Sequence, residues 1–216
     1  MQLSTITDNL DRYAEGFLGT LQLTFLGAAG ALVLGTVLAA MRVSPVASLR
    51  AGGLLYVETL RNFPLPVLVV LFAFGLPRVV GIRSFFIWAV IAIALYHAAF
   101  VCEALRSGIN SVGVGQGEAG RSLGLSFPQV LTLVVLPQAF RTVVPPLGNV
   151  LIALTKNTAV AATVDVTDLT NSTEFIINDT VDPLAAILGS AVCYLIITLP
   201  TGLYLGTVER RTAFAR

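Results

Sequence analysis

Charged side chains are scarce in this sequence. Asp, Glu, Lys and Arg make up 12% of its 216 residues, whereas 56% are hydrophobic. Soluble domains carry about 25% charged residues, because a surface that faces water needs them. The composition therefore excludes a soluble fold of this size and predicts an integral membrane protein. The formal net charge is +1 and the sequence has no basic run, so nucleic acid is not an expected partner.

Lysine and histidine occur once each, as Lys156 and His97. A nucleotide-binding P-loop needs Gly-Lys-Ser/Thr, and the residue before the lysine is Thr155, so we do not expect the chain to be an ATPase. A single histidine and the lack of a Gly-x-Ser-x-Gly turn leave no nucleophile–base set for a membrane enzyme, so no catalytic residue is predicted. Cys102 and Cys193 stand far apart in apolar stretches, and no metal site is expected.

Apolar stretches long enough to cross a bilayer, which takes roughly 20 residues, recur along the chain. We predict an all-α integral membrane protein with one domain, residues 1–216, and five transmembrane helices. The predicted spans cover residues 16–41, 54–77, 85–106, 130–156 and 183–208. Pro64 and Pro66 lie near the start of the second span. Pro145 and Pro146 predict a kink or a break within the fourth span.

The arginines predict the orientation of these spans, because segments on the cytoplasmic side are enriched in Lys and Arg. With the N-terminus outside and the C-terminus in the cytoplasm, the inner segments hold eight arginines and the outer segments hold four Lys or Arg residues. The inner arginines are Arg42, Arg50, Arg61, Arg106, Arg121, Arg210, Arg211 and Arg216. The outer segment 159–182 is acidic, and it predicts a short helix capped by Asp165 or Thr167.

Glu-x-x-Arg pairs recur on the predicted inner side. Residues i and i+3 are neighbours on a helix, so each pair is expected at least to neutralise its own charge locally. The pairs are Glu58/Arg61, Glu103/Arg106 and Glu118/Arg121.

Residues 115–125, GQGEAGRSLGL, are small, polar and charged, and an apolar run follows them. We expect a two-turn helix over Gln116–Leu123, with Glu118 in its first turn and Gly124 as its C-terminal cap. Ala119 and Gly120 have little bulk, so the surface of a partner could approach closely. An ordinary connecting loop is the alternative. The Gly-x-Gly-x-x-Gly pattern is not taken as a dinucleotide site, because a membrane helix and not a strand precedes it.

A longer pattern contains this segment. Glu118-Ala119-Gly120, then Gly124, then Val134-Val135-Leu136-Pro137 resembles the cytoplasmic loop Glu-Ala-Ala-x3-Gly-x9-Ile-x-Leu-Pro of permease subunits in binding-protein-dependent ABC importers. Gly120 and Val134 depart from that pattern but keep its size and character. Further segments look like the branch of this family that handles polar amino acids. Within that branch, MRVSPV (41–46), RSLGL (121–125) and IALTKNT (152–158) resemble glutamate-importer permeases of high-GC Gram-positive bacteria.

The resemblance implies a type I ABC importer permease fold in the bacterial cell membrane, with a cytoplasmic coupling helix at about residues 115–125. It implies separate ATPase subunits that bind ATP and Mg²⁺, a second permease subunit that is identical or a sister, and an external substrate-binding protein. No cofactor is expected on this chain. Contacts with the ATPase are implied for Gly115, Gln116, Gly117, Glu118, Ala119, Gly120, Arg121, Ser122, Leu123 and Gly124.

The third span, the fourth span and the two residues after it carry polar side chains that are candidates for contact with the substrate. They are His97, Arg141, Asn149, Thr155, Lys156, Asn157 and Thr158. A cation near the pathway would suit a carboxylate. As alternatives, His97 packs or hydrogen-bonds within the bundle, and Lys156 snorkels to the interface or contacts the external binding protein.

A stand-alone secondary transporter or channel subunit is the competing function. It predicts inverted internal repeats or several acids deep within the spans. The sequence shows no clear repeat, and its nearest candidate acid, Glu103, lies at the predicted inner end of the third span.

Overall fold

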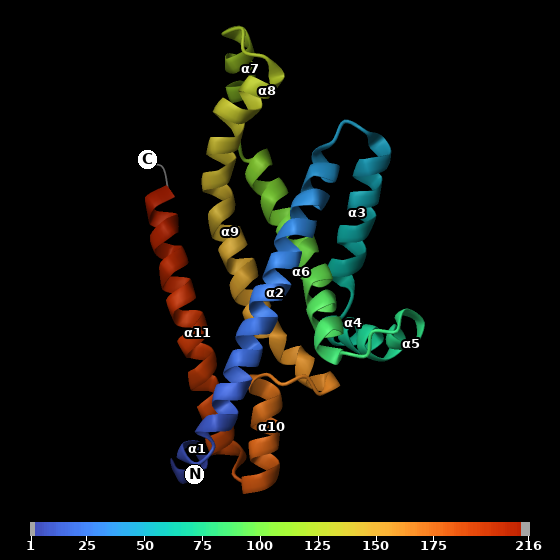
Figure 1. Ribbon diagram of the computed structural model, residues 1–216. Helices are drawn as coiled ribbons and strands as arrows, with labels where there is room; N and C mark the ends of the chain where they lie inside the picture. The colour runs from blue at the N-terminus through green and yellow to red at the C-terminus, as the bar shows by residue number, and fades with distance from the viewer. Residues whose placement is uncertain (1–2, 213–216) are drawn as a thin grey trace.

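Helices make up the structure, a computed structural model that describes residues 3–212 (Figure 1). No β-strand occurs among these residues, which confirms the predicted all-α class. The elements are α1 (Leu3–Thr7), α2 (Leu10–Val43), α3 (Ala47–Asn62), α4 (Leu65–Val70), the π-helix η1 (Leu71–Gly75), α5 (Pro77–Val80), α6 (Phe85–Asn110), α7 (Val114–Ser122), α8 (Phe127–Gln129), the π-helix η2 (Val130–Val135), α9 (Leu136–Asn157), the 3-10 helix η3 (Thr158–Val164), α10 (Leu169–Thr180) and α11 (Pro183–Thr212).

Four helical segments in the described part are long and apolar enough to cross a membrane, and a bent pair of helices gives up to five. The four are Leu10–Val43, Phe85–Asn110, Thr132–Val164 and Pro183–Val208. The bent pair consists of Ala47–Asn62 and Leu65–Val80, which meet at 104°. The segment predicted as the second span, residues 54–77, therefore contains a sharp bend.

The bend at the second span follows from Pro64. A proline disfavours the helical conformation of the residue before it, and Phe63 is extended, with φ −85° and ψ 136°. The chain then re-enters a helix at Leu65, where Pro66 occupies the first turn. Proline is tolerated at that position because its missing N–H has no partner there in any case.

The break predicted at Pro145 and Pro146 is not observed, because α9 runs through both residues as one helix. Adjacent prolines remove only two neighbouring hydrogen bonds, and packing against α6 and α11 supports α9 from outside. The backbone changes at the two ends of α9 instead, with π-helix before it and 3-10 helix after it. The irregular backbone therefore lies at the two ends of α9, one of them beside Asn157, rather than at the prolines.

The core is built around α2 and α6, which pack against each other along their lengths. Gly35 makes the close approach possible, because a Cβ atom there would lie 2.5 Å from Cγ1 of Val101. Small residues serve the same purpose in membrane helix pairs generally. Leu23, Ile93 and Leu154 fill the space between α2, α6 and α9 and are fully buried.

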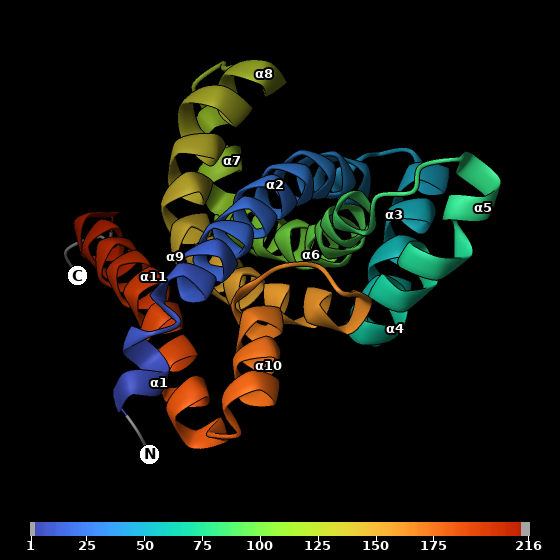
Figure 2. The same ribbon diagram turned by 60° about the horizontal axis from the view of Figure 1, so that its bottom comes forward.

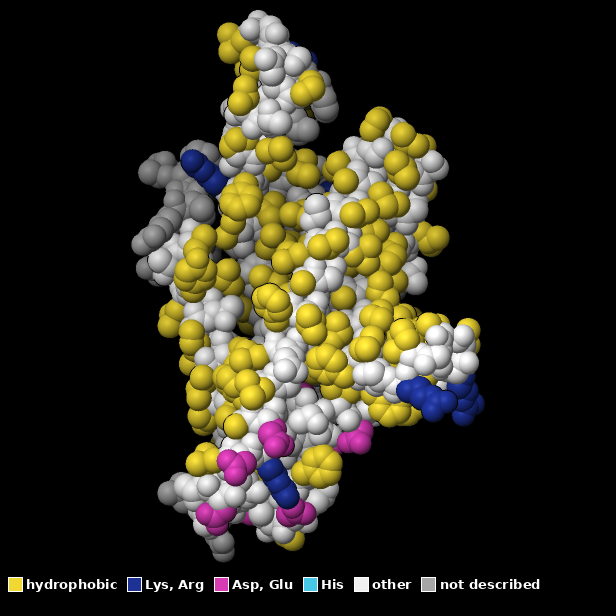
Figure 3. Space-filling view, viewed as in Figure 1, with side chains coloured by type: hydrophobic (Ala, Val, Ile, Leu, Met, Phe, Trp, Pro, Cys, Tyr) yellow, Lys and Arg dark blue, Asp and Glu magenta, His cyan; other side chains and the backbone are white. Residues whose placement is uncertain are grey.

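The two ends of the molecule differ in charge and shape. In Figure 1 the N-terminal helix α1 and α10 lie at one end, while α7 and α8 project at the other; Figure 2 shows the same separation from a second direction. Hydrophobic side chains cover the middle of the face shown in Figure 3, and acidic side chains gather at the end with α1 and α10. The assignment of that end to the outside remains a prediction from the arginines, of which Arg216 lies outside the described residues.

The short helix predicted in segment 159–182 is α10, but its cap is neither Asp165 nor Thr167. Asp168 caps it, with its Oδ1 accepting a hydrogen bond from the N–H of Asn171 at 2.8 Å. Asp165 instead ends η3 in the left-handed conformation, with φ 57°.

Candidate transport and coupling sites

The predicted coupling helix exists as α7, and it ends at the predicted glycine. Gly124 has φ +81°, its N–H donates to the carbonyl of Arg121 at 2.9 Å, and the N–H of Leu125 donates to that of Gly120 at 3.2 Å. This pair of bonds is the Schellman motif that glycine favours at helix ends. The helix begins at Val114, earlier than predicted, so Glu118 lies in the second turn and not in the first. The helix dipole therefore favours it less than expected.

Gly120 faces the rest of the chain rather than a partner. It is buried, and a Cβ atom on it would lie 3.1 Å from Cγ2 of Val130 and 3.7 Å from Cδ1 of Leu125. Its small size suits the packing of α7 onto η2, while contact of Gly120 with the ATPase stays a prediction. The exposed residues in this stretch are Gly115, Gln116, Glu118, Ala119, Arg121, Ser122, Leu123 and Gly124, and Gly117 is half-buried.

A cavity of about 340 Å³ lies between α6 and α9. The structure brings three of the predicted pathway residues to its wall, His97, Asn149 and Asn157. The remaining wall is apolar or aromatic and consists of Tyr96, Phe100, Val150 and Ala153. Such a mixture of apolar lining and a few placed polar groups is typical of a small-molecule site.

His97 is only 2% exposed and hydrogen-bonds through both ring nitrogens. Its Nδ1 lies 2.9 Å from the carbonyl oxygen of Ile93, and its Nε2 lies 3.1 Å from Nδ2 of Asn157. Tyr96 packs its ring edge-on at 5.1 Å between centroids. The residue therefore has the hydrogen-bonding role that the sequence suggested as one alternative, and it also borders the cavity.

The other predicted pathway residues are not among those that line this cavity. Thr155 and Thr158 are buried, and their hydroxyl groups donate to the carbonyls of Leu151 at 3.0 Å and of Thr155 at 2.8 Å. Lys156 and Arg141 are exposed.

Sequence reasoning missed an ionic cluster around Glu103. Its carboxylate lies 2.8 Å from Arg106, 3.1 Å from Arg42 and 4.0 Å from Arg61, so it connects α6 with α2 and α3. The predicted pair of Glu103 and Arg106 is confirmed. The spacing paired Arg61 with Glu58, whereas in the structure Arg61 forms an ion pair with Glu103.

Arg61 also borders the cavity indirectly, because its guanidinium lies 5.6 Å from the ring centroid of Phe100. The helix α3 ends at Asn62, just before the bend at Pro64, and its last turn places this arginine against Phe100 in the cavity wall. The sequence signal that could have indicated this position of Arg61 was its place three residues before Pro64 in an apolar stretch.

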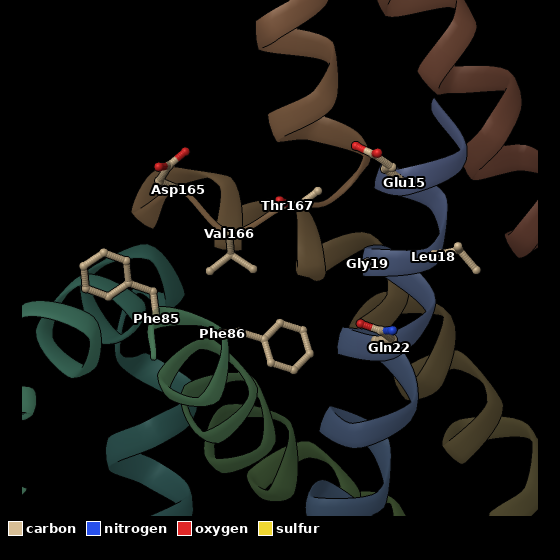
Figure 4. A pocket seen from close by; sticks show the side chains of 9 residues that line it. All are labelled: Glu15, Leu18, Gly19, Gln22, Phe85, Phe86, Asp165, Val166 and Thr167. Atoms are coloured by element: carbon tan, nitrogen blue, oxygen red, sulfur yellow. The ribbon is translucent and has the colours of Figure 1, made fainter. Parts of the chain in front are cut away.

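A wider pocket of about 620 Å³ opens at the acidic end of the molecule. Figure 4 shows Glu15 on α2 and Asp165 beyond η3 at its rim, with the rings of Phe85 and Phe86 beneath them. Gly19 lets the loop before α10 approach α2, because a Cβ atom there would collide with the carbonyl oxygen of Thr167.

Asp168 lies fully buried behind this pocket. Besides capping α10, it accepts a hydrogen bond from the hydroxyl of Tyr194 at 3.5 Å, which ties α10 to α11. Burial, together with the nearby charge of Glu174, raises the pKa of the Asp168 carboxyl to about 7.

The chain has long apolar helices, a cavity between them with a few polar groups, and a capped helix that projects from one end. These features define the chain as a membrane transport subunit. The family model described as "Binding-protein-dependent transport system inner membrane component" matches residues 31–214, and the chain belongs to this family. It is a multi-pass protein of the cell membrane and a permease, which is a transport component and not a catalyst.

Relatives and solved structures agree with this assignment. The chain is 42% identical to the glutamate transport system permease protein GluC of Corynebacterium efficiens, over 90% of this chain and 91% of that protein. It is 36% identical to the probable glutamine ABC transporter permease protein GlnM of Bacillus subtilis, over 98% of each. The crystal structure of an amino acid ABC transporter with histidines superposes with a TM-score of 0.91 at 30% identity, over 98% of this chain and 99% of that one. The fold is that of a type I ABC importer permease.

Proposed function

We propose that this chain is the permease subunit of an ATP-driven importer of polar amino acids and that its substrate is glutamate. The similarity to GluC over nine-tenths of the chain carries the proposal. Glutamine is the second candidate, because the similarity to GlnM extends over nearly the whole chain.

The cavity between α6 and α9 is the proposed substrate site. Asn149 and Asn157 offer amide groups to it, and His97 lies in its wall. Arg61 stacks on Phe100 behind the wall, so its guanidinium is close enough to favour an anionic substrate. Arg141, Lys156, Thr155 and Thr158 remain candidates elsewhere on the pathway.

The proposed partners divide the work of transport. ATPase subunits bind ATP and Mg²⁺, and they contact the exposed residues of α7. Movement of α7 then shifts the spans between inward-facing and outward-facing states. A second permease subunit completes the pore. An external binding protein delivers the substrate at the end that carries α10 and the acidic rim of the 620 Å³ pocket.

Uptake of labelled glutamate by cells that lack only this gene tests the substrate. Glutamine, arginine and histidine serve as competitors, and a plasmid copy of the gene serves as the control. We expect loss of glutamate uptake, restored by the plasmid, with little competition from the other amino acids. Undisturbed glutamate uptake in the deletion strain would refute glutamate as the substrate, and strong competition by glutamine would favour the second candidate.

A further inference from the structure

The hydrogen bonds of His97 determine which of its nitrogens carries the proton. A backbone carbonyl only accepts, so Nδ1 must donate to Ile93 across the 2.9 Å contact. The ring is neutral, because it is 2% exposed within a membrane-spanning helix and a buried charge without a counter-charge is costly. The ring also contacts Tyr96, Phe100 and Asn157, and the guanidinium of Arg61 on the Phe100 ring would disfavour an imidazolium further. Nε2 is therefore an acceptor.

This proton arrangement determines the orientation of the Asn157 amide. An accepting Nε2 at 3.1 Å requires the NH₂ group of Asn157 to point at His97. The orientation follows from the carbonyl of Ile93 and does not depend on telling nitrogen from oxygen in the side chain. Since Asn157 lines the cavity, the amide oxygen is the atom left over for a ligand there.

We propose that His97 is a positioning residue that turns the side-chain oxygen of Asn157 toward the cavity between α6 and α9, where it accepts a hydrogen bond from the ammonium group of an α-amino acid. The inference rests on the proposed function and adds the part of the substrate that this site recognises. The ligand class is any α-amino acid, because the ammonium group is common to all of them.

The cavity wall suits a cation at this place. The rings of Tyr96 and Phe100 flank His97 on α6, with centroids 5.1 Å apart, and aromatic faces attract ammonium groups within about 6 Å. Asn157 is the last residue of α9, where the helix tightens into η3. The oxygen is therefore presented from a helix end and not from the middle of a regular helix.

A double-mutant cycle tests the link between the two side chains. In the assembled transporter, His97→Leu and Asn157→Leu are each expected to lower glutamate uptake about tenfold, and the double variant to be no slower than either single one, since both remove the same oxygen from the cavity. His97→Gln is the matched control: its amide can donate to Ile93 and accept from Asn157, so at least half of the uptake should remain. Additive losses, or a His97→Gln variant as slow as His97→Leu, would overturn the proposal.

A pair of ligands tests the ammonium group itself. Glutarate is glutamate without the amine, and both are added to the purified permease–ATPase complex without binding protein, so that the binding protein takes no part in selecting between them. We expect the wild-type complex to bind glutamate at least tenfold more tightly than glutarate, and the Asn157→Leu complex to lose that preference. Equal binding of both ligands, or no glutamate binding by a wild-type complex that transports it, would overturn the inference.

An error in the proposed substrate would give a different result from an error in the proposed role of Asn157. A wild-type complex that imports glutamine but not glutamate would refute glutamate import, yet it should still bind glutamine at least tenfold more tightly than glutaramate, its analogue without the amine. Equal binding of glutamine and glutaramate in that complex would refute the role of Asn157 as well.

Discussion

Glu103 is the acid on which arginines from three helices converge, and its side chain is 21% exposed. Glu103→Gln removes the negative charge and leaves three arginines without a counter-charge, which we expect to destabilise the protein by about 1–3 kcal/mol, less than a fully buried pair would cost. Thermal denaturation of the purified transporter measures this loss. Glu58→Gln, at an exposed position on α3, is the control and should leave the melting temperature unchanged. A Glu103→Gln variant as stable as the control would contradict the role of the cluster.

Asp168 makes the stability depend on pH. Its pKa is about 7 in the folded chain against an ordinary value of 3.8, so the folded state holds a proton that the unfolded state has released between these values. Stability should therefore fall as the pH rises from 3.8 to about 7. Asp168→Asn keeps an oxygen to cap α10 and removes the titration. Melting curves at pH 5 and pH 8 should show a smaller loss for this variant than for wild type, and equal losses would contradict the prediction.

The helix α7 carries the proposed contact with the ATPase, and the exposure of its residues decides which one to substitute. Ala119 is exposed, whereas Gly120 is packed against Val130. Ala119→Trp should block docking without disturbing the fold, so we expect at least a tenfold loss of uptake and loss of co-purification with the ATPase, at a normal level in the membrane. Ala51→Trp, at an exposed position on α3, is the matched control. Normal uptake by the Ala119→Trp variant would contradict the assignment of α7.

Local sequence signals predicted some elements and not others. Gly124 identified the end of α7, because a left-handed residue after a short helix favours glycine. The prolines were harder to interpret: Pro64 sharply bends the second span, while Pro145 and Pro146 leave α9 continuous. How far a proline destabilises a helix depends on the packing around it, and this packing cannot be read from the local sequence. The cap of α10 was missed for a similar reason, because three candidate cap residues lie within four positions.

The whole molecule has charge-distinct ends, and the predicted orientation can be tested by labelling. Cys102 and Cys193 are first replaced by serine, and single cysteines are then introduced at Glu174 on α10 or at Gln116 on α7, both exposed. A maleimide that cannot cross the membrane should label Glu174→Cys in intact cells and Gln116→Cys only after permeabilisation. The reverse pattern would place the N-terminus in the cytoplasm.

The cavity shows the limit of sequence reasoning at this scale. Composition alone indicated a membrane protein, and the loop pattern indicated the family. Which of the seven candidate pathway residues meet was not predictable, because His97 on α6 and Asn157 at the end of α9 are distant in sequence and come together only through the packing of the two helices. The contact between Arg61 and Phe100 was not predicted either, since the bend at Pro64 was not foreseen.

ATP-dependent import into proteoliposomes is the most direct measurement for this permease. The vesicles contain this chain with its ATPase and second permease subunit, with the external binding protein and labelled glutamate on one side and ATP and Mg²⁺ on the other. We expect glutamate to accumulate only when ATP, the binding protein and this chain are all present. Glutamate accumulation without ATP or without the ATPase would show a stand-alone transporter and would contradict the proposed function.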